Sequence, residues 1–234
     1  MAKKGGSRHV IRMGASKNLG VISRKTVRWL LAPAPGPHKK SESISMGVLV
    51  RDVLNKANDL HEVKKILNSK TPIMVDGRKI KDEKFAIGLM DIVSMPAEKK
   101  TYRMSLDGPK MVPKEIEAAV SGKKYLKVIG KHMIKGKKIN ITFHDGRNYL
   151  GDNHIHTGDT CVFSVPEFKL LTHIKLEPGV TCLVIEGKHK GEIAKLEKII
   201  ERPGSHDTEA SLTGTSGEFV TVIKYLFAID ANYA

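Results

Sequence analysis

Apolar residues recur at helical spacing between residues 46 and 67. The first stripe consists of Met46, Leu49, Val50, Val53, Leu54 and Ala57, and the second of Leu60, Val63, Ile66 and Leu67. Asp59 lies where the N-cap of the second run is expected. Glu62, three residues later, completes a capping-box pattern. The spacing therefore predicts two consecutive helices.

After residue 70 the pattern changes to short apolar runs separated by turn residues. Asp76-Gly77 lies between two such runs, which is a strong hairpin signal, and a third apolar piece covers residues 85–93. We expect residues 42–100 to form a compact domain of two helices and a small hairpin.

The remainder of the chain has mostly the pattern of strands. We predict paired strands at 126–134 and 138–144, a third strand after the turn Asp145-Gly146, and strands at 160–165 and 169–176. A short helix is expected at 113–120. Further strands are expected at 181–185, at 192–200 and within 219–229, at the spacing typical of a small barrel. The predicted fold class is α+β and multidomain, with a basic arm at 1–41 and domains at 42–100, 101–174 (β-rich) and 175–234 (barrel).

Basic residues are concentrated at the start of the chain. Residues 1–41 contain ten Lys or Arg and no Asp or Glu, in a chain with a net charge of +15. This arm cannot bury enough surface to fold alone, so we expect it to be disordered in the free protein and to become ordered on a polyanion. Its prolines at 33–37 impose an extended strap, and Trp29, Leu30 and Leu31 are expected to anchor it on the first domain. The alternative is a merely solubilising tail.

Candidate phosphate-binding residues occur in three places: the arm, the second helix with its hairpin turn, and a turn bracketed by Gly187 and Gly191. The two glycines permit a tight chain reversal, and the histidine between them could stack on a base or donate a hydrogen bond. A solvated helix face and a plain hairpin turn are the alternatives for the last two places. The candidates are Arg8, Arg12, Lys17, Arg24, Lys25, Arg28, Lys39, Lys40, Lys64, Lys65, Lys70, Arg78, Lys188, His189 and Lys190.

Metal and disulfide chemistry find little support. Cys161 and Cys182 are the only cysteines and are isolated from each other, which excludes a Cys-based zinc site and argues against a disulfide scaffold. A metal site could instead be formed by His144, Asp145, Asp152, His154 and His156. Such residues more often line a polar loop, so we expect no metal and no cofactor.

Enzymatic and membrane functions are also not expected. No carboxylates are paired at a spacing that suits acid–base catalysis, and no nucleophile triad or nucleotide-binding glycine motif stands out. No apolar run approaches the roughly 20 residues that span a membrane, and the N-terminus lacks the apolar core of a signal peptide.

Several stretches resemble a known family. The predicted helix–helix–hairpin with basic residues on its second helix resembles the alpha-L RNA-binding fold, and the strand–turn–strand around Gly187-Lys-His-Lys-Gly191 resembles a KOW module, which is an SH3-like barrel. The order of these two units, the phrase Ala-Pro-Gly-Pro-His-Lys before the first helix, Pro203-Gly-Ser-His-Asp207 and the closing stretch 219–229 together resemble the archaeal and eukaryotic small-subunit ribosomal protein S-four-e family.

The resemblance covers nearly the full length and favours the archaeal branch. It implies a structural, non-enzymatic ribosomal protein in the cytoplasm that contacts small-subunit ribosomal RNA through the candidate residues. It also implies neighbouring ribosomal proteins as partners, with no membrane and no homo-oligomer. Two alternatives remain open: a KOW-containing transcription or translation factor, and an RNA-modifying enzyme. Each would need a further domain that the sequence does not display.

Overall fold

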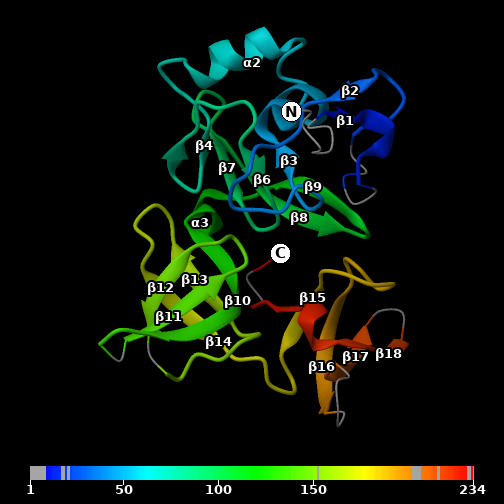
Figure 1. Cartoon of the computed structure of the whole chain (residues 1–234), viewed down its shortest axis with the longest axis vertical. Coiled ribbons are helices and arrows are strands. Elements are labelled where there is room, and N and C mark those ends of the chain that lie inside the picture. The colour runs from blue at the N-terminus through cyan, green and yellow to red at the C-terminus, as the bar shows by residue number, and fades with distance from the viewer. Residues whose placement is uncertain are drawn as a thin grey trace, which may run out of the picture. The chain divides into compact units, whose positions relative to one another are not determined.

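The computed structural model describes residues 9–16, 19, 22–136, 138–151, 153–201, 207–214, 217–230 and 233. The chain forms two compact units (Figure 1). The first contains Met1–Ser105 and Lys110–Glu115, and the second contains Leu106–Pro109 and Ile116–Ala234. Most elements in both units are strands and few are helices. The finer division at residues 41, 100 and 174 remains a prediction.

The described part of the arm is folded, which corrects the expectation of disorder. Strand β1 (Val10–Ile11) pairs with β2 (Trp29–Leu30), and a 3-10 helix covers Arg12–Gly14. Leu19, Ile22 and Leu30 are buried, so the few apolar residues of the arm suffice to hold it once a domain surface is present. Trp29 does not serve as the expected anchor, because half of it is exposed.

The helical part of the first unit is shorter and less regular than the sequence predicts. Helix α1 (Met46–Val48) continues directly into a π-helix at Leu49–Val53, and a positive φ at Asn55 ends this segment. Helix α2 (Leu60–Leu67) begins after Asp59 as expected. The capping box is not formed: the Asp59 side chain makes no capping bond, and Glu62 accepts its hydrogen bond from the backbone N–H of Asn58, the residue before the N-cap.

Short strands complete the first unit. The predicted hairpin is present as β4 (Met74–Val75) and β5 (Arg78–Lys79), with positive φ at both turn residues, Asp76 and Gly77. The sheet order is β5-β4-β7-β8-β9, and β3 and β6 form a separate pair. The bounds of the remaining strands are β3 Ile44–Ser45, β6 Ala86–Ile87, β7 Ile92–Met95, β8 Lys100–Asp107 and β9 Lys110–Glu115.

The proline strap is fixed to the first unit by hydrogen bonds. The N–H of Ala34 donates to the Lys84 carbonyl at 2.7 Å. At the end of the strap, the buried His38 ring places Nε2 2.9 Å from Asp91 Oδ2, which also accepts from the Gly88 N–H. A Cβ atom on Gly88 would overlap the His38 ring, so glycine is required for this close approach.

The second unit begins with an antiparallel sheet of order β12-β11-β10-β13-β14. The bounds are β10 Lys123–Ile134, β11 Lys138–Phe143, β12 Asn148–Gly151, β13 Thr160–Ser164 and β14 Leu170–Ile174. These strands match the predicted ones closely. The helix predicted at 113–120 is shorter and begins later. Residues 113–115 belong to strand β9, and helix α3 covers only Ala118–Ser121.

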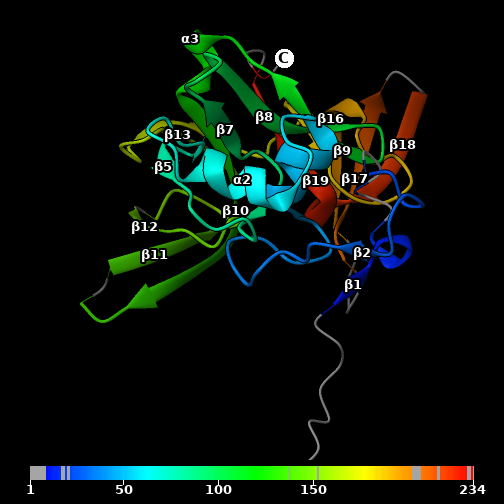
Figure 2. The same cartoon turned by 90° about the horizontal axis from the view of Figure 1, so that it is seen from above.

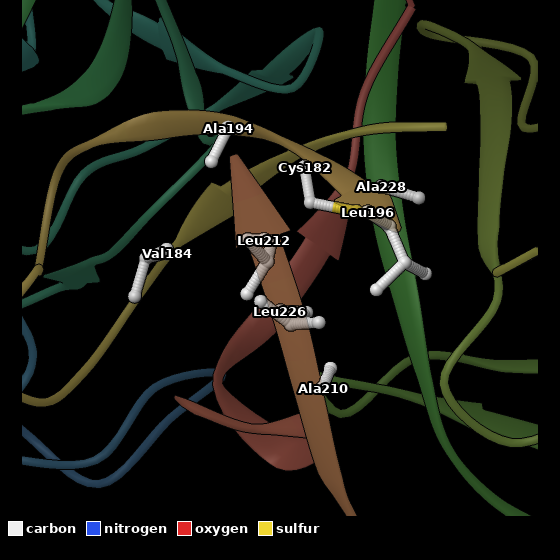
Figure 3. Close-up of a cluster of buried hydrophobic side chains, with 8 residues drawn as sticks. All are labelled: Cys182, Val184, Ala194, Leu196, Ala210, Leu212, Leu226 and Ala228. Carbon is white, nitrogen blue, oxygen red and sulfur yellow. The ribbon is translucent and has the colours of Figure 1, made fainter. Parts of the chain in front are cut away.

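A second antiparallel sheet, of order β18-β17-β16-β15-β19, follows. The bounds are β15 Thr181–Val184, β16 Ile193–Ile200, β17 Glu209–Gly214, β18 Gly217–Val222 and β19 Leu226–Ala228, with a 3-10 helix at Ile223–Tyr225. Strand β17 had not been predicted. Figure 3 shows the core enclosed by this curved sheet, which consists of small aliphatic side chains and Cys182.

Candidate nucleic-acid interface

The cations of the arm differ sharply in exposure. Arg8 and Lys17 lie outside the described residues. Lys25 and Arg28 are exposed, and the Arg28 guanidinium lies 4.9 Å from the centroid of the half-exposed Trp29 ring. An exposed cation beside an exposed indole can contact both a phosphate and a base. Trp29 is therefore a candidate RNA contact, which the sequence pattern did not indicate because Trp29 was expected to anchor the arm.

Arg12 does not fit the expected phosphate contact. Its side chain is 3% exposed, forms an ion pair with Asp52 and donates from Nη1 to the Ser23 carbonyl at 2.8 Å. Burial alone would raise the pKa of Asp52, but hydrogen bonds from Arg51 and Arg12 outweigh it and hold that pKa below its usual range. Arg12 therefore fastens the arm to the domain instead of facing solvent.

The remaining cations of the first unit are mostly on the surface. Arg24 is half-buried and donates to the Met13 carbonyl. Lys64 is exposed but lies 3.3 Å from Glu83 Oε1, and Lys39 lies 3.5 Å from Glu42 Oε1. A carboxylate neighbour of this kind weakens the attraction of a phosphate. The candidates whose side chains are simply exposed are Lys40, Lys65, Lys70 and Arg78.

The turn at 187–191 has the backbone that its glycines predict. Gly187 and Gly191 have φ values of +92° and +87°, where L side chains are strained. A Cβ atom on Gly191 would also overlap the backbone of Gly108, so this glycine permits a close approach of two turns in the second unit. Lys188 is exposed, whereas Lys190 is partly buried.

The His189 ring already has partners within the turn and the neighbouring sheet. Its ring stacks on Phe219 with a centroid distance of 4.0 Å and an interplanar angle of 10°, and Nδ1 lies 3.3 Å from Glu192 Oε2. The expectation that it stacks on a base is therefore not supported by the geometry. Among His189 and the two lysines of this turn, Lys188 is the exposed side chain.

A second stretch without acidic residues had not been singled out from the sequence. Residues 118–144 contain seven lysines and no Asp or Glu. Most of this stretch forms β10 and β11 of the second unit. Lys123, Lys135 and Lys138 are exposed there, whereas Lys124 and Lys127 are buried. Measuring the spacing between successive Asp or Glu residues along the sequence would have revealed this stretch.

The histidine-rich region has other partners than a metal. His144 Nδ1 accepts from the Lys127 N–H at 3.2 Å, the His154 ring lies against that of His173, and the His156 N–H donates to Asp159. Within the described ranges, no three His, Cys, Asp or Glu side chains are grouped so that they could hold a metal ion. Asp152 lies outside these ranges.

The two cysteines are not suited to nucleophilic chemistry. Cys161 and Cys182 are free and buried, and burial raises the pKa of each thiol to about 12, so neither is a ready nucleophile.

In the part of the chain that the structure covers, none of the helices has the length and apolarity to cross a bilayer.

Comparison with known proteins gives consistent matches. A sequence model described as "Ribosomal family S4e" matches residues 98–170. The chain is 38% identical over 213 residues to a protein of Methanothermobacter thermautotrophicus named "Small ribosomal subunit protein eS4", with coverage of 90% of this chain and 88% of the relative. A protein of the same name from Methanosphaera stadtmanae is 35% identical over 233 residues, covering 99% and 96%.

A solved structure is also similar. The crystal structure of the 30S ribosomal protein S4e from Thermoplasma acidophilum matches with a TM-score of 0.69 and 27% identity. The match covers 82% of this chain and 96% of that chain, so both compact units are included in the likeness.

Proposed function

This chain belongs to the ribosomal family S4e, and on that premise we propose that it is a structural constituent of the small ribosomal subunit that binds ribosomal RNA. It supports subunit assembly and translation in the cytoplasm, and it has no enzymatic role. The observation that carries this conclusion is the likeness over nearly the whole chain to proteins named small ribosomal subunit protein eS4. The net charge of +15 suits a polyanionic partner.

The proposed division of labour has four parts. Residues 1–41 act as the basic arm, residues 42–100 as an alpha-L-type RNA-binding domain, residues 101–174 as the central β-rich domain and residues 175–234 as a KOW barrel. The two-residue hairpin after helix α2 supports the second assignment, and the glycine-bracketed turn between β15 and β16 supports the fourth.

Exposed cations are the proposed phosphate contacts. Arg12 and His189 are set aside, because one is buried against Asp52 and the other is stacked on Phe219. The proposed contacts are Lys25, Arg28, Lys39, Lys40, Lys64, Lys65, Lys70, Arg78 and Lys188. Neighbouring ribosomal proteins are further partners, and the protein acts as a single copy without a membrane.

Cosedimentation tests the proposal directly. The full-length protein, expressed with an epitope tag in an archaeal host, is expected to sediment with small subunits and to remain there after a high-salt wash. A protein bound only through its charge would be released, because phosphate contacts weaken steeply with salt. Recovery of the protein in the soluble fraction, away from small subunits, would contradict the assignment.

A further inference from the structure

The outer half of strand β10 extends beyond the sheet that holds its inner half. Residues Lys123–Lys127 pair with β13, whereas Gly130–Ile134 pair with β11, after a register shift between Val128 and Gly130. Strand β12 pairs with β11 in turn. The outer halves of β10 and β11 therefore project as a ribbon from the second unit (Figure 2).

Near its base, one face of this ribbon packs on the core and the opposite face is turned away from the core. At the outer end, Met133 of the first face is 72% exposed. Directly paired residues share a face, so Ile141 and Phe143, which are buried, define the inner side. We call the opposite side the outward face. It consists of His132, Ile134, Lys138, Asn140, Thr142, Asn148 and Leu150. Within this face Asn140 is buried, whereas His132 and Asn148 are exposed.

Polar groups occupy the centre of the outward face in a fixed arrangement. Asn140 Nδ2 lies 3.1 Å from His132 Nε2, and the Thr142 hydroxyl donates to Asn148 Oδ1 at 2.8 Å. These hydrogen bonds link three adjacent strands. The buried Asn140 positions the exposed His132 ring, and Thr142 positions the exposed amide of Asn148. Amide and imidazole edges can pair with the edges of unstacked bases, and an imidazole ring can also stack on them.

Apolar and cationic side chains flank this polar centre. Leu150 is 58% exposed and Ile134 is 41% exposed, so each presents apolar surface to solvent. Lys135 and Lys138 are exposed at the tip of the ribbon, within the stretch 118–144 that contains no acidic residue. A protein partner with a neutral or basic surface would not be favoured by this charge, whereas a nucleic acid would.

We propose that the outward face binds an unstacked, single-stranded segment of RNA. Lys135 and Lys138 meet phosphates, the exposed His132 and Asn148 contact base edges, and Leu150 packs against a base plane. Double-stranded RNA fits less well, because its major groove is too deep and narrow for side chains to read and its minor groove presents mainly sugar hydroxyls. The inference rests on the proposed function and assigns that function a surface in the second unit.

A matched pair of substitutions tests the surface. Leu150→Glu places an anion on the outward face, while Leu171→Glu places one at a similarly exposed leucine on β14 of the same sheet. With full-length protein and a small-subunit ribosomal RNA transcript at fixed salt, Leu150→Glu is expected to raise Kd at least tenfold. Leu171→Glu is expected to change Kd less than twofold, and both variants should melt near the wild-type temperature.

A second pair keeps the test decisive if Leu150→Glu does not fold. His132→Ala combined with Lys138→Ala removes two exposed side chains of the face, and Lys169→Ala removes a lysine that is 74% exposed in the connection between β13 and β14. The double variant is expected to lose about fivefold or more in affinity. Its salt dependence should become shallower by about 0.7 log units per log unit of salt, the value for one lost phosphate contact on a single strand.

The outcomes separate the two proposals. If the wild-type protein prefers the ribosomal transcript over bulk transfer RNA but the face variants bind like their controls, the outward face is not an RNA contact. Unchanged RNA affinity with lost incorporation into reconstituted subunits would assign the face to a neighbouring protein and would also overturn the proposal. If the wild-type protein shows no preference for the ribosomal transcript, the proposed function fails, and the outward face falls with it.

Discussion

The two stretches without acidic residues, 1–41 and 118–144, both contain many cations and both bury some of them. They contain ten and seven Lys or Arg residues, respectively. Each commits some of these to the protein interior: Arg12 forms an ion pair with Asp52, and Lys124 lies 3.2 Å from Asp145 with both side chains 1% exposed. Burial, not the number of charges, decides which cations remain able to meet a phosphate.

The two stretches differ in what holds them. The arm has a ladder of two residue pairs between β1 and β2, supported by buried apolar side chains and by Arg12. Most of the second stretch lies in longer ladders that pair β10 with both β11 and β13. We therefore expect the arm to adapt its shape to a partner, whereas the outward face presents its groups in a preformed arrangement.

The largest effect is expected at the buried pair of the second stretch. Asp145→Ala leaves Lys124 buried without this carboxylate, which should lower the free energy of unfolding by about 3–5 kcal/mol. Thermal and urea denaturation measure the loss. Asp207→Ala, which removes the carboxylate of an exposed pair with Lys224, should change stability by less than about 0.5 kcal/mol. Equal effects of the two variants would contradict the role of burial.

In the arm, we expect the buried Arg12 to affect stability and the exposed Arg28 to affect RNA binding. Arg12→Ala removes the ion pair with Asp52 and is expected to lower stability by about 1–3 kcal/mol. Arg28→Ala should leave stability within about 0.5 kcal/mol of wild type. Arg28→Ala should instead make the salt dependence of RNA binding shallower by about 0.7–0.9 log units of affinity per log unit of salt. Denaturation and filter binding on the same preparations distinguish the two, and a reversed pattern would show that the arm rearranges on binding.

Trp29 tests whether the arm also contacts bases. Trp29→Ala should weaken binding to the ribosomal transcript by about 1–3 kcal/mol, the range for loss of one base–aromatic stack. The salt dependence should stay unchanged, because no charge is removed. Leu30→Ala is the matched control, since Leu30 is buried and its truncation should lower stability first. Wild-type affinity for Trp29→Ala would limit the arm to phosphate contacts.

The smallest effect concerns Lys127, a buried lysine of the second stretch. Among the described residues, its ammonium group is hydrogen-bonded to backbone carbonyls and not to a carboxylate. That group donates to the carbonyls of Lys224 and Leu226 at 2.7 and 2.6 Å, and burial lowers its pKa from 10.5 to about 8. The folded state then binds fewer protons than the unfolded state between pH 8 and 10.5, so stability rises with pH in that window.

The two buried thiols act in the opposite direction from about pH 8 upward, because their pKa values are raised from 9.0 to about 12. The Lys127 effect is therefore isolated by comparing the wild type with Lys127→Met, since both proteins share the thiol contribution. Urea denaturation at several pH values should show that the stability of the wild type relative to this variant increases by about 1 kcal/mol between pH 8 and 9. A difference in stability that does not change with pH would assign the effect to another group.

Much of the secondary structure could be predicted from short-range patterns. Asp76-Gly77 specifies a two-residue hairpin because both positions tolerate positive φ, and Gly187 and Gly191 do the same for the later turn. The strands at 126–134, 138–144 and 160–165 were found because their side chains alternate or are uniformly β-prone. The first helix was predicted only in part, since its π-helical turn depends on packing around Leu49 and Val50, both of which are fully buried.

The sequence by itself determined the positions of the turns, most strands and the two acid-free stretches, because each is encoded by residues close together in the chain. The tertiary structure alone decided the fate of individual side chains. Arg12 is buried because Asp52, forty residues away, lies beside it, and His189 is held by Phe219 from another strand. Likewise, only the pairing of β10, β11 and β12 gathers His132, Asn140 and Leu150 on one face. Burial and neighbourhood arise from distant segments, and local propensity does not record them.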